Sequence, residues 1–236
     1  MEEKQVVTMT FFRYLKPANK WWAFRQMGLA PKQISGAEGL EFFRLLGSGS
    51  GNGFSILPDF GAYGLLAAWQ HEAGSRQFFS GHTFFQQFRQ SCDEILTIFM
   101  RTTQVHGRWE GQTPFRVAAL SDAGLPLGVL TRATIRPGQL WRFWRSVPQV
   151  SRSVENQEGL LFSKGIGELP LVQQATFSLW QNSQLMKDYA YKSRYHKEVV
   201  RRTRELGWYK EEMFARFQPY AVEGSWEGRN PLDGYV

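Results

Sequence analysis

The chain has 236 residues, a net charge of +7 at pH 7 and an aromatic content of 15%. That length suits one large domain or two of about 110 residues, and the single cysteine, Cys92, excludes an internal disulfide and a cysteine-based zinc site. The sequence shows neither a signal peptide nor a run of about 18 apolar residues that would span a bilayer. We therefore expect a cytoplasmic protein, whose only contact with a membrane would be peripheral, at the inner membrane.

The hydrophobic periodicity of the first half predicts the series strand, helix, strand, strand, helix, strand. These elements are expected at 5–13, 18–29, 40–47, 61–69, 71–92 and 95–106. The second half predicts the same series, at 129–136, 139–146, 160–166, 172–180, 183–206 and 212–222. Asn182 is expected to cap the long helix and Gly207 to end it. Each half therefore has the order of a ferredoxin-like unit, a split βαβ.

Four sequence blocks of the first half recur in the second half in the same order, which indicates a duplication. The blocks at 21–25, 39–47, 65–69 and 107–111 resemble those at 140–144, 159–167, 176–180 and 224–228. The predicted fold class is α+β, with tandem duplicated ferredoxin-like (βαββαβ) units that form a dimeric-type α+β barrel within one chain. We expect the first repeat at 1–112, a linker at 113–127, and the second repeat with the cofactor site at 128–236.

A glycine-rich stretch, Gly47-Ser-Gly-Ser-Gly-Asn-Gly53, lies between the second and third predicted strands. A phosphate-binding loop would open a helix, whereas another strand follows here. We interpret the stretch as an enlarged strand connection that permits close backbone approach.

The long helix expected at 183–206 carries a stripe of residues spaced by threes and fours, which includes His196 and Val200. His196 is therefore expected on the face that meets the sheet, either as a metal ligand or as a core histidine. His82 occupies nearly the same place in the first repeat and is the rival ligand.

Lys164 shares one predicted strand face with Leu160, Phe162 and Ile166. A lysine on a covered face is costly unless it is paired or contacts a ligand, although its ammonium can also extend to water. On a neighbouring strand, the small residues Thr131 and Ala133, with Ile135, leave room under the helix. A flat cofactor there would contact His196 on one side and Lys164 on the other.

Motifs of other enzyme classes, such as GxSxG, HExxH and CxxC, do not occur. The basic run at 197–204 is typical of the solvated face of a helix, so we expect no nucleic-acid partner.

The sequence resembles the spheroidene monooxygenase family over nearly its whole length. The resemblance depends on the segments at 22–28, 47–54, 107–115, 130–137, 165–170 and 207–217. The chain departs from the family pattern inside the glycine stretch and around His82, where the family has no histidine, and this favours His196 as the ligand.

The resemblance implies oxygen insertion at C2 of an acyclic carotenoid such as spheroidene, giving a 2-oxo product. It implies molecular oxygen, a reduced ferredoxin-like electron donor and haem b, whose iron His196 would ligate. Lys164 and Arg132 would form hydrogen bonds with the distal oxygen or a propionate. The residues expected to contact the cofactor are His196, Phe162, Ala133, Phe177 and Val200. The positive charge is suited to an acidic ferredoxin or to lipid head groups, and the aromatic excess to a polyene tunnel.

Three alternatives stay open. A haem lyase or dehydratase on the same fold would need no external electron donor. A cofactor-free monooxygenase would bind no haem. A carrier of haem or carotenoid would bind its ligand without turnover.

Overall fold

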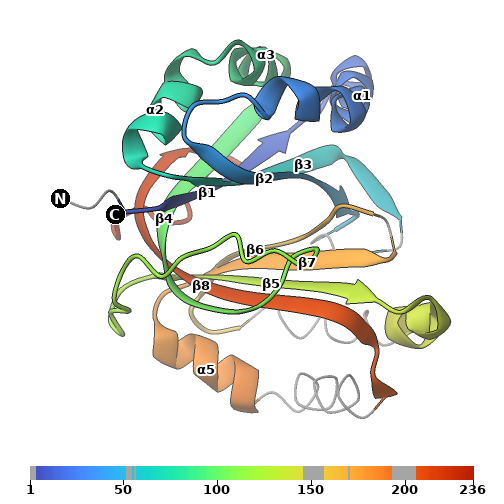
Figure 1. The fold of residues 1–236 in the computed structure, drawn as a ribbon, viewed down its shortest axis with the longest axis vertical. Helices are drawn as coiled ribbons and strands as arrows, with labels where there is room; N and C mark the ends of the chain where they lie inside the picture. The colour runs from blue at the N-terminus through green and yellow to red at the C-terminus, as the bar shows by residue number, and fades with distance from the viewer. Residues whose placement is uncertain (1–3, 52–54, 56, 146–156, 170, 193–205) are drawn as a thin grey trace.

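The computed structural model describes residues 4–51, 55, 57–145, 157–169, 171–192 and 206–236. Within these residues, eight strands form a closed antiparallel barrel in the order β1-β3-β2-β6-β7-β5-β8-β4, and β4 pairs back onto β1 (Figure 1). The strands are β1 (Val6–Arg13), β2 (Leu40–Gly49), β3 (Pro58–Trp69), β4 (Glu94–Gly107), β5 (Leu127–Ile135), β6 (Leu160–Gly167), β7 (Gln173–Trp180) and β8 (Tyr209–Gly224). The expected α+β barrel is confirmed.

Each repeat contributes one half of the barrel wall, as β4-β1-β3-β2 and as β8-β5-β7-β6. The two halves meet along two seams of unequal length. β4 and β8 pair along nearly their whole lengths, whereas β2 and β6 pair only at Gly47–Gly167 and Ser48–Ile166. The β2–β6 seam is therefore the less extensively paired side of the wall.

The repeated Gly-x-Trp-Glu-Gly motif forms the turns that follow β4 and β8. After β4, the backbone N–H groups of residues 110–111 donate to the carboxylate of Glu211 on β8. After β8, the N–H groups of residues 227–228 donate to Glu94 on β4. Each repeat thus holds the turn of the other, which stabilises the long seam.

Helices cover the outer faces of the two halves (Figure 1). The first half is covered by α1 (Pro17–Ile34), α2 (Glu72–Gly81) and α3 (Thr83–Ser91), and the second by α5 (Ser183–Lys192). A short 3-10 turn, η1 (Pro137–Gln139), continues into helical residues 140–145. In the parts of the chain that the structure describes, no helix is both long and apolar enough to cross a membrane.

Two helices of the first repeat differ from the expectation. The helix expected at 71–92 is divided into α2 and α3, because His82 between them has extended dihedral angles of φ −68° and ψ 123°. α1 continues beyond residue 29 to Ile34, since Pro31 lies in its last turn and disrupts few helical hydrogen bonds.

The expected start of the second-repeat helix is confirmed, because the Asn182 side chain accepts hydrogen bonds from the backbone N–H groups of residues 184 and 185. Gly207 has a φ of 57°, which suits its expected role at the helix end. The rest of that expected helix, at 193–205, lies outside the described residues.

Strand alternation divides the buried side chains into an interior core and outer layers. The interior core draws on all eight strands and includes Met9, Phe11, Leu46, Leu66, Ile98, Leu130, Ile166, Phe177 and Ala215. The outer layer of the first repeat is rich in aromatic residues and includes Phe12, Trp69, Phe78, Phe85, Phe88 and Phe99.

Candidate functional site

The outer face of the second half of the barrel carries mostly small and polar side chains. Strand pairing aligns one row across this face, made of Ser163, Ser178, Val129 and Arg216. The adjacent row is Gly165, Thr176, Thr131 and Phe214. A small buried cluster of Leu127, Val129, Trp180 and Met186 joins α5 to one end of the face. We call the surface formed by these two rows the second outer face; most of its side chains are short, and several carry hydrogen-bonding groups.

Two polar atoms of the first row, Ser163 Oγ and Arg216 Nε, are buried and have no hydrogen-bond partner among the described residues. The Arg216 guanidinium lies over the Phe214 ring, 5.3 Å from its centroid. An unpaired buried polar group costs about 1–3 kcal/mol. Atoms of this kind are therefore candidates for binding a group that the described residues do not supply.

Lys164 lies on the interior face of β6, and the expectation that it faces the helix is corrected. The pairing of β6 with β7 shifts register between Leu160 and Phe162. Leu160 consequently packs in the outer layer, whereas Phe162 packs against the interior core. Lys164 does share a strand face with Phe162 and Ile166, as predicted, but that face is the interior one, and the extra residue places Leu160 on the opposite side.

Lys164 is buried, with its side chain 9% exposed, and is held by groups of both repeats. Its Nζ donates to the Gly51 carbonyl oxygen at 3.0 Å, lies 4.0 Å from Asp59 Oδ2, and sits 5.5 Å from the centroid of the Trp226 ring. Burial lowers the pKa of Lys164 below its ordinary value, and the Asp59 carboxylate opposes this shift. The ammonium is therefore bound within the protein and does not extend freely to water.

Arg132 is fully buried and also faces the interior, over the Trp109 ring. Its guanidinium pairs with Glu211 at 2.5 Å and with Glu168 at 3.4 Å. Glu168 in addition accepts from Arg44 Nε at 2.6 Å. The Arg132 charge is thus compensated by carboxylates at the end of the barrel.

The structure does not bring the other predicted site residues together. Phe177 lies in the interior with Phe162, whereas Ala133 shares the outer side of β5 with Val129. His196 and Val200 lie outside the described residues. The contacts predicted for these residues with a cofactor stay predictions.

The rival histidine, His82, stands between α2 and α3, with its ring centroid 4.8 Å from that of Phe78. Its Nδ1 is buried and has no hydrogen-bond partner within the described ranges. Over those same ranges, no cluster of three or more His, Cys, Asp or Glu side chains could hold a metal ion.

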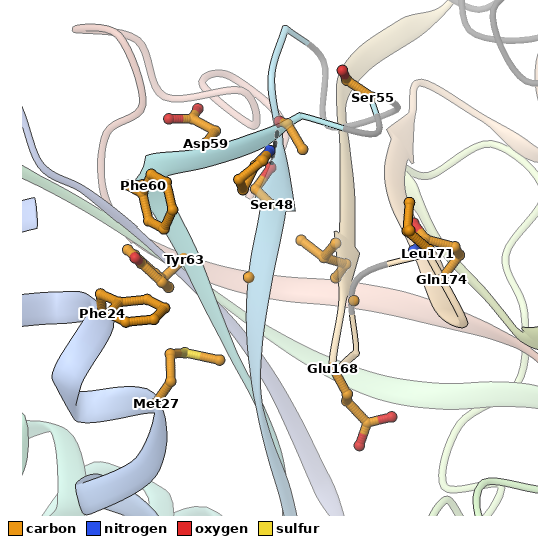
Figure 2. Close-up of a pocket in the computed structure, with 15 residues that line it drawn as sticks. Phe24, Met27, Ser48, Ser55, Asp59, Phe60, Tyr63, Glu168, Leu171 and Gln174 are labelled. Carbon is orange, nitrogen blue, oxygen red and sulfur yellow. Dashed lines mark hydrogen bonds between the residues drawn. The ribbon is translucent and has the colours of Figure 1, made fainter. Parts of the chain in front are cut away.

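A groove of about 280 Å³ lies at the β2–β6 seam (Figure 2). Phe24 and Met27 of α1 and Phe60 of β3 form one wall, and Leu171 and Gln174 form the other. The floor includes the backbone of Gly47, Gly49 and Gly167. We call this cavity the seam groove.

Most polar side chains along the seam groove are already bound by other protein groups. Ser48 Oγ donates to the Gly165 carbonyl oxygen at 2.9 Å, and Asp59 accepts from the Gly61 N–H at 2.8 Å. Glu168 binds Arg44 and Arg132, as described above. The groove therefore presents mainly apolar and aromatic surface to a ligand.

Two parts of this arrangement were not predicted from the sequence, namely the unpaired atoms of Ser163 and Arg216 and the seam groove. One signal was visible. The duplicated blocks align Phe43 with Ser163, so an aromatic residue in the first repeat corresponds to a serine in the second.

No protein-family model matches the chain. The chain does match curated proteins named spheroidene monooxygenase. The one from Rhodobacter capsulatus is 33% identical over 233 residues, covering 98% of this chain and 97% of its own. The one from Cereibacter sphaeroides is 31% identical and covers 97% of this chain and 71% of its own. The one from Rubrivivax gelatinosus is 32% identical and covers 90% and 82%.

Solved structures show the same fold at low sequence identity. A crystal structure of aldoxime dehydratase aligns with a TM-score of 0.69 at 10% identity, over 99% of this chain and 88% of that one. An aldoxime dehydratase in complex with butyraldoxime aligns with a TM-score of 0.65 at 9% identity, over 99% and 86%. At these identities the likeness concerns the fold alone.

Proposed function

Because the chain belongs to the spheroidene monooxygenase family and is therefore an oxidoreductase, we propose that it inserts oxygen at C2 of an acyclic carotenoid such as spheroidene. The product is a 2-oxo carotenoid. The reaction consumes molecular oxygen and electrons from a reduced ferredoxin-like donor. Haem b on the second outer face is the proposed cofactor, with His196 as the ligand of its iron.

The observation that carries the haem proposal is that the second outer face combines short side chains with hydrogen-bond donors that have no partner among the described residues. Thr131, Ala133 and Thr176 have short side chains, which leave space for a flat ring system beside the sheet. Ser163 Oγ and Arg216 Nε lack partners among the residues that the structure describes. A haem carries two anionic propionates and binds oxygen, so the residues present fit this group.

The protein residues hold and orient the reactants. Haem supplies the activation of dioxygen when it is bound. Arg216 would hold the cofactor by donating a hydrogen bond to a propionate, and Ser163 would do the same from β6. We favour these two residues over Lys164 and Arg132, whose charged groups face the interior and already pair with protein groups. Phe162 and Phe177 then support the sheet from its interior side.

The proposed partners follow from charge and from the apolar substrate. The net charge of +7 favours an acidic electron donor and anionic lipid head groups. Since a carotenoid dissolves in the bilayer, peripheral contact with the inner membrane would bring the protein to its substrate.

The experiment that tests the haem proposal is the visible spectrum of the protein purified from cells supplied with haem. We expect a Soret band in the wild type and in His82→Ala, and its loss or shift in His196→Ala. His82→Ala is the matched control, because it removes the rival histidine of the first repeat.

Two results would contradict the proposal. Folded wild-type protein without a Soret band would exclude haem dependence. A Soret band that is unchanged in His196→Ala would exclude His196 as the ligand. Turnover is tested separately, by supplying spheroidene, oxygen and reduced ferredoxin and measuring the mass of the carotenoid product.

A further inference from the structure

The seam groove has a floor of main chain in place of side chains. Gly47 and Gly167 pair directly across the β2–β6 seam. Among the described residues, a Cβ atom added at Gly47 would have one neighbour within 4 Å, the Gly167 carbonyl oxygen at 3.9 Å. Gly47 does not adopt a positive φ, so its backbone conformation does not require glycine. What the glycine provides here is open space above the floor.

The walls of the seam groove are aromatic and partly exposed. Phe24 and Phe60 pack edge to face, with ring centroids 5.5 Å apart, and each is 46% exposed. Figure 2 shows these two rings with Met27 and Tyr63 on one side of the glycine floor, and Leu171 with Gln174 on the other. Exposed aromatic rings that line a cavity indicate a ligand with an apolar surface.

The far end of the seam groove leads onto the second outer face. Gln174 lines the groove and pairs with Ala133 on β5. Ala133 lies on the same side of β5 as Thr131 and Val129, two residues of that face. A long molecule in the groove would therefore run from α1 across the seam and direct one end towards the proposed cofactor position.

We propose that the seam groove binds the hydrocarbon chain of the acyclic carotenoid and presents one chain end to the second outer face. This assignment rests on the proposed function. A polyene is long, thin and uncharged, which suits a groove with aromatic walls and a bare floor. Most polar side chains of the groove are already paired, although the Tyr63 hydroxyl group is buried without a hydrogen-bond partner among the described residues. Holding the chain along its length would also select oxidation near its end.

The experiment is a titration of the purified holoprotein with spheroidene in detergent micelles, followed by quenching of tryptophan fluorescence. Gly47→Leu should fill the groove and raise the Kd at least tenfold, without changing the haem spectrum. Phe24→Ala should raise the Kd about threefold through lost ring contact, and serves as the second variant if Gly47→Leu does not fold. Leu29→Ala is the matched control on α1, because Leu29 is 49% exposed and is not among the groove residues. It should leave the Kd within twofold.

The outcomes separate the two proposals. If the wild type converts spheroidene and folded Gly47→Leu and Phe24→Ala bind it as tightly as the wild type does, the groove assignment is wrong and the proposed function stands. If the wild type neither binds nor oxidises spheroidene, the proposed function fails, and the groove assignment fails with it.

Discussion

The outer faces of the two repeats occupy equivalent positions but carry different side chains. In the first repeat, strand pairing aligns Phe43, Ala67, Thr8 and Phe99 in one row. The equivalent row of the second repeat is Ser163, Ser178, Val129 and Arg216. The equivalence follows from the pairing, because Val6 pairs with Trp69 in the first repeat and Leu127 with Trp180 in the second.

The difference between the two faces shows how a duplicated fold divides its tasks. In the first repeat, Phe78 and Phe79 of α2 pack against Trp69 and Phe99, and the phenylalanines of α3 belong to the same buried cluster. In the second, both aromatic ends of the row are replaced, by Ser163 and Arg216. The second row lacks this aromatic packing, and this difference is the reason why we propose a ligand on the second outer face and not on the first.

The largest expected effect tests the packing role of the first face. Phe99 is completely buried, so Phe99→Ala should lower the free energy of unfolding by about 3–5 kcal/mol. The equivalent change in the second repeat, Arg216→Ala, should cost less than about 1 kcal/mol in haem-free protein, since it removes a buried donor that has no partner among the described residues. Urea denaturation of both variants measures the difference. Equal losses would contradict the proposed division of roles.

The second prediction makes the second face resemble the first. Ser163→Phe copies Phe43 into the equivalent position and should fill the space proposed for haem. We expect haem occupancy to fall at least tenfold, while the far-ultraviolet circular dichroism spectrum stays that of the wild type. Ser163→Ala is the control, because it removes the hydroxyl group without filling the space and should retain haem with a shifted spectrum. Full occupancy in Ser163→Phe would place haem elsewhere.

The barrel could be predicted from the sequence because duplication preserves periodicity, turns and block order together. The same register shift occurs near the start of β2, between Leu40 and Phe42, and of β6, between Leu160 and Phe162. Alternation of apolar residues cannot reveal such a shift. The apolar residue before the shift is buried in the outer layer and the one after it in the interior core, so both look buried in the sequence. This is why Leu160 was wrongly assigned to the same face as Lys164.

The polar groups of the site were harder to predict, because their partners are distant in sequence. Arg132 and Glu211 are separated by 79 positions and meet only once the barrel has closed. Arg132 occupies the interior position equivalent to Phe11 of the first repeat. Phe11 packs against Trp226, whereas Arg132 lies over Trp109. The strand pairing shows that this position holds an apolar residue in one repeat and a charged one in the other, and the sequence did not indicate the carboxylates that compensate the charge.

The smallest expected effect compares the two glutamates that hold the repeated turns. Burial raises the pKa of Glu211, but the backbone N–H groups of residues 110–111 and the Arg132 guanidinium outweigh it and hold the pKa below its ordinary value of 4.5. A carboxylate whose pKa is lower in the folded state stabilises the protein above its unfolded-state pKa, and that stabilisation is lost as the pH falls through the folded-state value. Because the Glu211 side chain is 24% exposed and solvent screens it, we expect no more than about 1 kcal/mol.

Glu211→Gln should therefore be less stable than the wild type at pH 7. The unfolding midpoints of the two proteins should converge as the pH falls below about 4.5. Urea denaturation at several pH values measures both effects. Glu94→Gln is the matched variant in the first repeat. Glu94 binds the equivalent turn, but its partner Arg13 is partly exposed, whereas Arg132 is fully buried. Removing the Glu211 charge leaves the buried Arg132 cation with less compensation. Glu211→Gln should therefore lose more unfolding free energy at pH 7 than Glu94→Gln does. Equal losses would mean that the turn hydrogen bonds, which the two repeats share, outweigh the buried charge that only the second repeat contains.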